Sequence, residues 1–309
     1  MRRAYDRRTV TLIDRDGNGR DDREDLYELA AQALRDRGFL LHPPACTPAD
    51  GADDRQRRDL TGLPWSSIDN ASSRDLDQVE YAEAHDGFVR VMVGIADVTD
   101  AVPLDGDVDT AARHNTTTVY TAGGVFPMLP SALCEDATSL LDAMVRRAVV
   151  TTLDVAPDGT VLRAEHFPAF VRNRRKLTYP EVSAWLDGSP PPDSLHDEAL
   201  QQQVMLQERV ATWLRAHRKA RGGAGFDLPE TELVRDAEGH VVDIVARTQG
   251  RAERIVEDLM IAVNEAVART LEGDGFSSIR RVVPPPPRWD RMREVAARWG
   301  DALPEAPDA

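Results

Sequence analysis

Apolar residues repeat with two different periods along this chain, and the order of the two periods limits the fold most. Spacings of three and four residues predict amphipathic helices, and short runs rich in Val, Ile and Thr predict strands. The two kinds of segment follow one another without the regular alternation of a doubly wound sheet. We therefore expect an α+β (mixed α/β) fold, with a mixed sheet flanked by helices. The predicted strands cover residues 63–69, 87–97, 146–154, 161–167, a pair within 227–245, and 279–283; the predicted helices cover residues 21–37, 178–186, 197–221, 253–271 and 290–299.

The first 58 residues differ in composition from the rest of the chain. After the helix predicted over 21–37, residues 41–58 are rich in Pro, Asp and Arg and poor in apolar side chains. This composition is typical of a linker. We expect a helical extension and linker over residues 1–58 and the main domain over residues 59–309.

The charge balance and the apolar patterning exclude several classes of protein. Thirty-eight Lys and Arg against 53 Asp and Glu leave a net charge of −15, which argues against a protein that coats duplex DNA. No apolar run reaches the ~18 residues of a membrane span, and the N-terminus lacks a secretion signal. Cys46 and Cys134 are far apart in the sequence, and we expect reduced, buried thiols. A cytoplasmic protein without membrane association is predicted.

A cluster of acids after the first predicted strand is the strongest chemical signal. Asp69, Asp75 and Asp77 lie within nine residues, among Asn and Ser. Hard divalent cations prefer several carboxylate oxygens that converge on one point, and a loop at a strand end can supply them. Such a site supports metal-assisted phosphoryl transfer. From spacing alone, a solvated turn explains the same residues equally well.

The wider sequence around these acids resembles the RNB domain of the ribonuclease II and ribonuclease R exoribonucleases. The resemblance begins with residues 59–78, Asp-Leu-Thr-Gly-Leu-Pro-Trp-Ser-Ser-Ile-Asp-Asn-Ala-Ser-Ser-Arg-Asp-Leu-Asp-Gln. It continues in order through residues 93–100, 111–141, 176–179, 222–230 and 255–268. Several co-linear motifs over about 250 residues are specific, whereas one acidic loop is not. The resemblance implies an RNB-type catalytic domain over residues 59–309, incomplete at its C-terminus.

The resemblance also implies roles for individual residues. Asp69, Asp75 and Asp77 match three of the family's four carboxylates at a Mg²⁺ site, and the fourth falls at Gln78, a neutral amide. Tyr120 and Phe226 match the aromatic residues that pack against the terminal bases of the RNA. Stacking accepts every base, as an unspecific exonuclease requires. An ordinary strand tyrosine and a core phenylalanine are the alternatives.

Charged residues further along the chain complete the implied RNA site. Glu257 and Asp258 match an acidic pair that reaches toward the terminal ribose or the metal, and the sequence does not decide which of the two does so. The basic segments 171–176 and 215–221 stand out in an acidic chain. Each alone is typical of a solvated face, but with the resemblance we expect Arg172 and Arg174 to contact RNA phosphates.

The implied function is a Mg²⁺-dependent 3′→5′ exoribonuclease that hydrolyses single-stranded RNA to nucleoside 5′-monophosphates, with no small-molecule cofactor. Two departures favour an alternative, and the first is the neutral Gln78 at the fourth carboxylate position. The chain ends before the family's later segment, whose arginine holds the scissile phosphate, so a catalytically impaired RNA-binding remnant or half-enzyme is the second hypothesis. A separate polypeptide that completes the C-terminal part would then be a partner.

Residues 14–25 give a third, unrelated hypothesis. Their acids, amide and glycine are spaced as in a calcium loop of the EF-hand kind, but the last ligand position is Asp25 instead of Glu. A turn that caps the next helix is the preferred interpretation.

Overall fold

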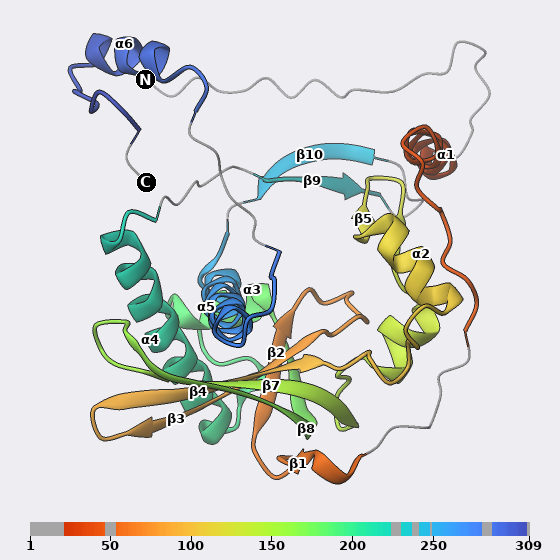
Figure 1. The fold of residues 1–309 in the computed structure, drawn as a ribbon, viewed down its shortest axis with the longest axis vertical. Helices are drawn as coiled ribbons and strands as arrows, with labels where there is room; N and C mark the ends of the chain where they lie inside the picture. Colours follow the sequence, from red (N-terminus) through yellow and green to blue (C-terminus); the bar gives the residue numbers. More distant parts are fainter. Residues whose placement is uncertain are drawn as a thin grey trace.

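The computed structural model describes residues 22–46, 54–223, 230–236, 241–247, 249–279 and 286–307. Its centre is a six-stranded mixed sheet (Figure 1) with the order β1-β8-β2-β3-β4-β7. Strands β1 and β2 run parallel to β8, and the other pairs are antiparallel. The strands are β1 Arg58–Asp59, β2 Trp65–Asp69, β3 Gln78–His85, β4 Phe88–Ala96, β7 Val145–Val155 and β8 Val161–Thr178.

The long strand β8 curls the sheet back on itself. Its first part, up to Arg172, pairs with β7, and its last part, from Asn173 to Thr178, pairs with β2. Both faces of the sheet are therefore buried over much of their length. A small cluster that includes Trp65, Val79 and Val150 fills the inner side of this curl.

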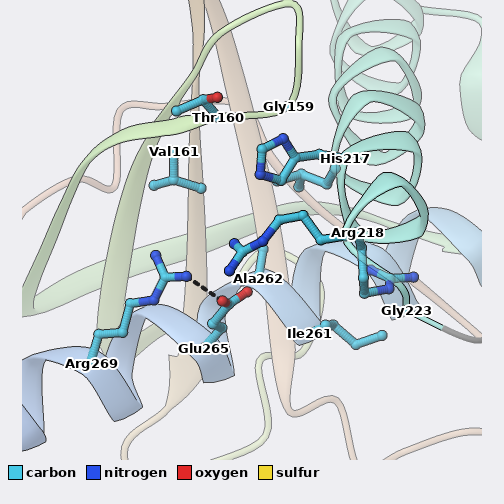
Figure 2. A pocket seen from close by; sticks show the side chains of 12 residues that line it. Gly159, Thr160, Val161, His217, Arg218, Gly223, Ile261, Ala262, Glu265 and Arg269 are labelled. Carbon is cyan, nitrogen blue, oxygen red and sulfur yellow. Dashed lines mark hydrogen bonds and ion pairs between the residues drawn. The ribbon is translucent and has the colours of Figure 1, made fainter. Parts of the chain in front are cut away.

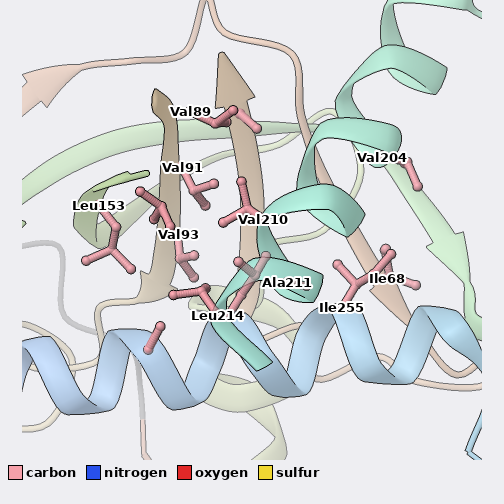
Figure 3. Packing of buried hydrophobic residues seen from close by; sticks show 14 of the residues in the cluster. Ile68, Val89, Val91, Val93, Leu153, Val204, Val210, Ala211, Leu214 and Ile255 are labelled. Carbon is pink, nitrogen blue, oxygen red and sulfur yellow. The ribbon is translucent and has the colours of Figure 1, made fainter. Parts of the chain in front are cut away.

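Helices cover the other face of the sheet. Helices α3 (Tyr179–Leu186), α4 (Glu198–Ala220) and α5 (Arg251–Gly273) pack their apolar sides against strand residues in the larger core cluster. Figure 3 shows Val210 and Ala211 of α4 next to Val93 of β4, with Ile255 of α5 close to Ile68 of β2. This packing fixes α3, α4 and α5 on the sheet, next to the end of β2.

The N-terminal helix α1 (Asp22–Arg35) packs against a segment that follows β4. This segment contains α2 (Asp107–Asn115) and the two-stranded hairpin β5 (Val119–Tyr120) and β6 (Val125–Phe126). Tyr27 of α1 stacks on Phe126 at 5.1 Å between ring centroids. The Asn115 side chain exchanges two hydrogen bonds with the backbone of Leu40. The start of the chain thus supports the hairpin that carries Tyr120.

The predicted fold class is confirmed, and the predicted helices and most predicted strands occur with small shifts in their ends. The exception is the strand predicted over 161–167, because β8 continues to Thr178. The sequence pattern did not indicate β3, α2 or the short strands β1, β5 and β6. Residues 280–283 of the strand predicted at 279–283, and most of the proposed calcium loop, lie outside the described residues. The remaining elements are β9 (Glu230–Arg235), β10 (Val241–Arg247), α6 (Trp289–Arg298), short helical turns at Asp54–Gln56 and Asp193–Leu195, and a π-helical turn at Leu133–Ala137.

Two composition-based expectations can be compared with this structure. Within the described ranges, no helix is long and apolar enough to cross a membrane. Cys46 and Cys134 are both free thiols, as predicted, but each is only partly buried.

Candidate active site

The acids at residues 69–77 form the loop between β2 and β3, called here the acidic loop. Ser66 of β2 lies opposite Glu80 of β3 in the antiparallel register. Continuing this register places Asp69, the last residue of β2, opposite Asp77, the residue before β3. Two of the three predicted ligands thus meet at the end of one strand pair, and Asp75 lies on the loop between them.

Side chains from later in the chain hold the acidic loop in place. The Lys176 ammonium, on β8, donates to the carbonyl oxygens of Ala71 at 3.0 Å and of Ser73 at 2.5 Å. The Ser139 hydroxyl donates to the carbonyl of Arg74 at 2.7 Å. The loop conformation is therefore set largely by bonds to its backbone. Among its carboxylates, Asp69 accepts a hydrogen bond from the Asn70 N–H at 2.6 Å.

The carboxylates of the acidic loop repel one another. Partial removal from water, followed by the charges of Asp77, Glu135 and Asp69, raises the pKa of Asp75 to about 6, against a hydrogen bond from Cys134 that lowers it. Burial, with a contribution from Asp69, also raises the pKa of Asp77. Such a group of acids favours a bound cation, because a positive charge relieves the repulsion.

The sequence analysis missed one buried acid on β3, three residues after Asp77. Glu80 is only 1% exposed, and both its carboxyl oxygens lack a hydrogen-bond partner among the described residues. Burial, followed by the charges of Asp77 and Asp69, raises its pKa well above the usual value. Tyr179 is close to the same group: burial, followed by the charges of Asp69 and Glu80, raises the pKa of its hydroxyl. The only sequence signal for Glu80 was its place two residues after Gln78.

Gln78 opens β3 and lies at the border of the site. It is buried, and its amide nitrogen lies 3.4 Å from the carbonyl oxygen of Ile68, on the neighbouring strand. This side chain therefore turns toward the backbone of β2 and brings no charge to the acidic loop.

The donor atoms of this site suit a hard cation, but they are not gathered around one point. In the part of the chain that the structure covers, no three Asp, Glu, His or Cys side chains form a group that could hold a metal ion. The carboxylates of Asp69, Asp75 and Asp77 nevertheless offer only oxygen atoms as donors. This chemistry fits Mg²⁺ and not a soft metal.

Tyr120 lies beside the acidic loop with its ring mostly exposed. Its side chain is 73% exposed on β5. Its pKa is raised by partial burial and by the charges of Asp75 and Asp77, which places the hydroxyl near these acids. An exposed ring next to the acids can stack on a base. Phe226, the other predicted aromatic, lies outside the described residues.

The acidic pair on α5 divides into one exposed and one buried residue. Glu257 is exposed, whereas Asp258 is only 1% exposed. The Asp258 carboxylate accepts hydrogen bonds from Arg215 Nε at 2.7 Å and from Arg218 Nη2 at 2.6 Å, both on α4. Asp258 thus joins two helices, and part of the basic segment 215–221 serves this contact.

The other basic segment lies on β8. Arg174 is exposed, and its guanidinium lies 3.4 Å from the carbonyl oxygens of Thr61 and Gly62. Arg172 is half-buried, with its Nε lacking a partner among the described residues. The same strand carries Lys176, which holds the acidic loop.

A cavity of about 320 Å³ lies away from these acids, between the β7–β8 turn, α4 and α5. Figure 2 shows His217 and Arg218 of α4 and Arg269 of α5 around it, with Arg269 paired to Glu265. The β7–β8 turn follows Val155, which pairs with Val89 near the start of β4. Gln78, next to the acidic loop, pairs with Ile95 near the other end of β4. Six strand residues, or about 20 Å, therefore separate the cavity from the acidic loop.

Comparison with known proteins identifies the family. The family model for the RNB domain matches residues 57–305, and the chain belongs to this family. It is 37% identical over 220 residues to Exoribonuclease 2 of Enterobacter sp. (strain 638), a match that covers 70% of this chain and 34% of that protein. It is 37% identical over 238 residues to Ribonuclease R of Mycoplasma pneumoniae (strain ATCC 29342 / M129 / Subtype 1), covering 74% of this chain and 32% of that protein.

A solved structure shows the same fold. Mycoplasma genitalium RNase R in complex with ribose methylated single-stranded RNA matches with a TM-score of 0.83 and 25% identity, over 92% of this chain and 46% of that one. The resemblance found in the sequence is confirmed. The chain spans about a third of the length of the curated relatives it matches, and the comparisons give no support to a completing polypeptide.

Proposed function

We propose that this protein is a Mg²⁺-dependent 3′→5′ exoribonuclease that hydrolyses single-stranded RNA and releases nucleoside 5′-monophosphates. The observation that carries the proposal is the acidic loop: in an RNB-family chain, Asp69 and Asp77 meet at the end of β2 and β3, with Asp75 between them. Relatives named as exoribonucleases and a related RNase R bound to single-stranded RNA support the class of reaction and substrate.

Each residue of the site has a defined task in this proposal. Asp69, Asp75 and Asp77 hold Mg²⁺, which when bound supplies positive charge at the phosphate and activates the attacking water. Lys176 keeps the loop in position through the carbonyls of Ala71 and Ser73. These contacts involve the loop backbone and do not occupy the three carboxylates.

The remaining residues bind the RNA chain. Tyr120 stacks on a base near the 3′ end, and Phe226 is the predicted second aromatic. Arg172 and Arg174 meet phosphates further along the strand. Of the acidic pair on α5, Glu257 is the residue that remains available for the ribose, because the Asp258 carboxylate is engaged by Arg215 and Arg218. Gln78 borders the loop from β3.

The alternative, a catalytically impaired RNA-binding remnant or half-enzyme, is not favoured, since the relatives are named as exoribonucleases. The two functions differ in the products that they give. A working exonuclease shortens RNA from its 3′ end and releases mononucleotides, whereas a remnant binds RNA and leaves it intact.

A turnover assay tests the proposal. Single-stranded RNA labelled at its 5′ end is incubated with Mg²⁺ and the 309-residue chain, its Asp77→Asn variant, or an Asp86→Asn control at the opposite end of β3. We expect a ladder that shortens from the 3′ end for wild type and the control, and no ladder for Asp77→Asn. Equal turnover by Asp77→Asn, or RNA binding by wild type without any ladder, would refute it.

A further inference from the structure

The hairpin β5–β6, which carries Tyr120, is too short to hold its own shape. Each of its strands has two residues. Val119 pairs with Phe126, and Tyr120 pairs with Val125. Even a two-stranded hairpin of ordinary length is only marginally stable in water. Another element must therefore fix the direction in which the Tyr120 ring points.

The side chains of the hairpin divide between an inner and an outer face, because successive residues of a strand point to opposite sides. Phe126 is only 3% exposed, and Val119 packs with it against the small apolar cluster on α1. Their neighbours Tyr120 and Val125 are 73% and 52% exposed. The inner face thus attaches the hairpin to α1, and the outer face presents the Tyr120 ring.

Helix α1 lies next to the hairpin (Figure 1) and contacts both its strands and its turn. Tyr27 stacks on Phe126, with 5.1 Å between the ring centroids and 22° between the ring planes. Gly123, in the turn, lies so close to α1 that an added Cβ would overlap with the backbone of Leu26 and Tyr27. At Gly124 an added Cβ would lie 3.2 Å from the Tyr27 ring. Tyr27 is therefore the residue of α1 that touches the strand and the turn together.

The segment that follows α1 is fastened to the end of α2, just before β5. The His114 ring nitrogen Nε2 donates to the Gly38 carbonyl at 2.6 Å. The Asn115 side chain accepts from the Leu40 N–H at 3.0 Å and donates to the Leu40 carbonyl at 2.8 Å. Aromatic stacking and hydrogen bonds thus hold α1 and the hairpin in one arrangement.

The charge of α1 makes it a poor RNA-binding surface in its own right. Its sequence contains four acids and two arginines, and a negatively charged helix repels phosphates. The match to the RNB domain begins at residue 57, so α1 also lies outside the matched domain. Any contribution of α1 to RNA binding is therefore expected to act through the hairpin.

We propose that α1 is a positioning element for RNA binding, and that Tyr27 is the residue through which it fixes the Tyr120 ring. This inference rests on the proposed function, because it assumes that Tyr120 stacks on a base. Without the contact to α1, the hairpin adopts several orientations, and RNA binding then includes the entropic cost of ordering it. A helix outside the RNB domain thereby sets the affinity of that domain for RNA.

Fluorescence anisotropy with single-stranded RNA, labelled with fluorescein at its 5′ end, tests the proposal. Every chain carries Asp77→Asn to prevent cleavage, and the added changes are Tyr27→Ala, Tyr27→Phe, Tyr120→Ala, Tyr27→Ala with Tyr120→Ala, and Leu29→Ala. We expect Tyr120→Ala to raise Kd roughly 5- to 100-fold and Tyr27→Ala to raise it by about 3-fold or more. Tyr27→Phe keeps the stacked ring, and Leu29 is on the exposed side of α1, so both should bind like the parent chain.

The double variant separates positioning from a general loss of structure. Once the Tyr120 ring is absent, α1 has no ring to position, so the double variant should bind as well as Tyr120→Ala alone. If Tyr27→Ala raises Kd by the same factor with and without Tyr120, α1 acts by another route and the proposal is overturned.

Thermal unfolding verifies that the variants are folded. The two larger core clusters contain no described residue of α1, so Tyr27→Ala should keep the main unfolding transition of the parent chain. If Tyr27→Ala does not fold, Gly123→Ala disturbs the same contact from the side of the hairpin and should give the same rise in Kd.

The titrations also distinguish this inference from the proposed function. If Tyr120→Ala raises Kd but neither Tyr27→Ala nor Gly123→Ala does so, the stacking role stands and the positioning role of α1 is wrong. If Tyr120→Ala binds RNA like the parent chain, the stacking role and this inference fail together, while the turnover assay decides the exonuclease activity separately.

Discussion

The carboxylate of Asp258 offers the sharpest test of how this fold divides its acids between structure and chemistry. Asp258 is 1% exposed and bridges α4 and α5, accepting from Arg215 Nε at 2.7 Å and from Arg218 Nη2 at 2.6 Å. Its neighbour Glu257 is exposed. We expect Asp258→Asn to destabilise the fold and Glu257→Gln to leave its stability unchanged.

The size of the effect follows from the environment of the three side chains. Removing one partner of a buried ion pair costs about 3–5 kcal/mol. Here the arginine side chains are 39% and 35% exposed, so water recovers part of the loss. The asparagine oxygen also keeps one hydrogen bond. We therefore expect a loss of about 2 kcal/mol, which lowers the unfolding temperature by roughly 4–8 °C in a domain of this size.

Urea unfolding followed by tryptophan fluorescence measures the free energy of unfolding of both variants. Glu257→Gln should stay within about 0.5 kcal/mol of wild type, as exposed substitutions usually do. At temperatures where Asp258→Asn is folded, its affinity for Mn²⁺ should equal that of wild type. Unchanged stability of Asp258→Asn, or an equal loss in Glu257→Gln, would refute the structural assignment of Asp258.

Three further substitutions test other parts of the structure. Lys176→Met removes the bonds to two carbonyls of the acidic loop; we expect weaker Mn²⁺ binding in titrations, and wild-type affinity would contradict a positioning role. Tyr120→Ala, in the Asp77→Asn background that prevents cleavage, should weaken RNA binding by about 1–3 kcal/mol in fluorescence anisotropy, whereas no change would exclude stacking. Gly159→Ala should destabilise the fold by about 2 kcal/mol or more in urea unfolding. The reason is that Gly159 has φ +82° and an added Cβ would lie 2.3 Å from the Trp213 carbonyl oxygen. Wild-type stability of this variant would show that the turn can move away from α4.

The sequence pattern of β3, a strand that the sequence analysis missed, misleads about its burial. Residues 78–85 alternate apolar Val79 and Tyr81 with polar Gln78 and Glu80, which is typical of a strand with one face in water. The structure buries both faces of its first five residues. One face lies within the curl of the sheet, and the other lies beneath the helices.

The sequence by itself determined the fold class, most helices and strands, and the three acids of the loop, because these depend on local periodicity and on short spacings along the chain. Only the tertiary structure decided which other groups meet those acids. Lys176 holds the loop that carries them because the end of β8 pairs with β2. Asp258 is committed to Arg215 and Arg218 because α4 packs beside α5. Such contacts join residues that are distant in the sequence, and their free energy depends on burial and charge that local patterns do not contain.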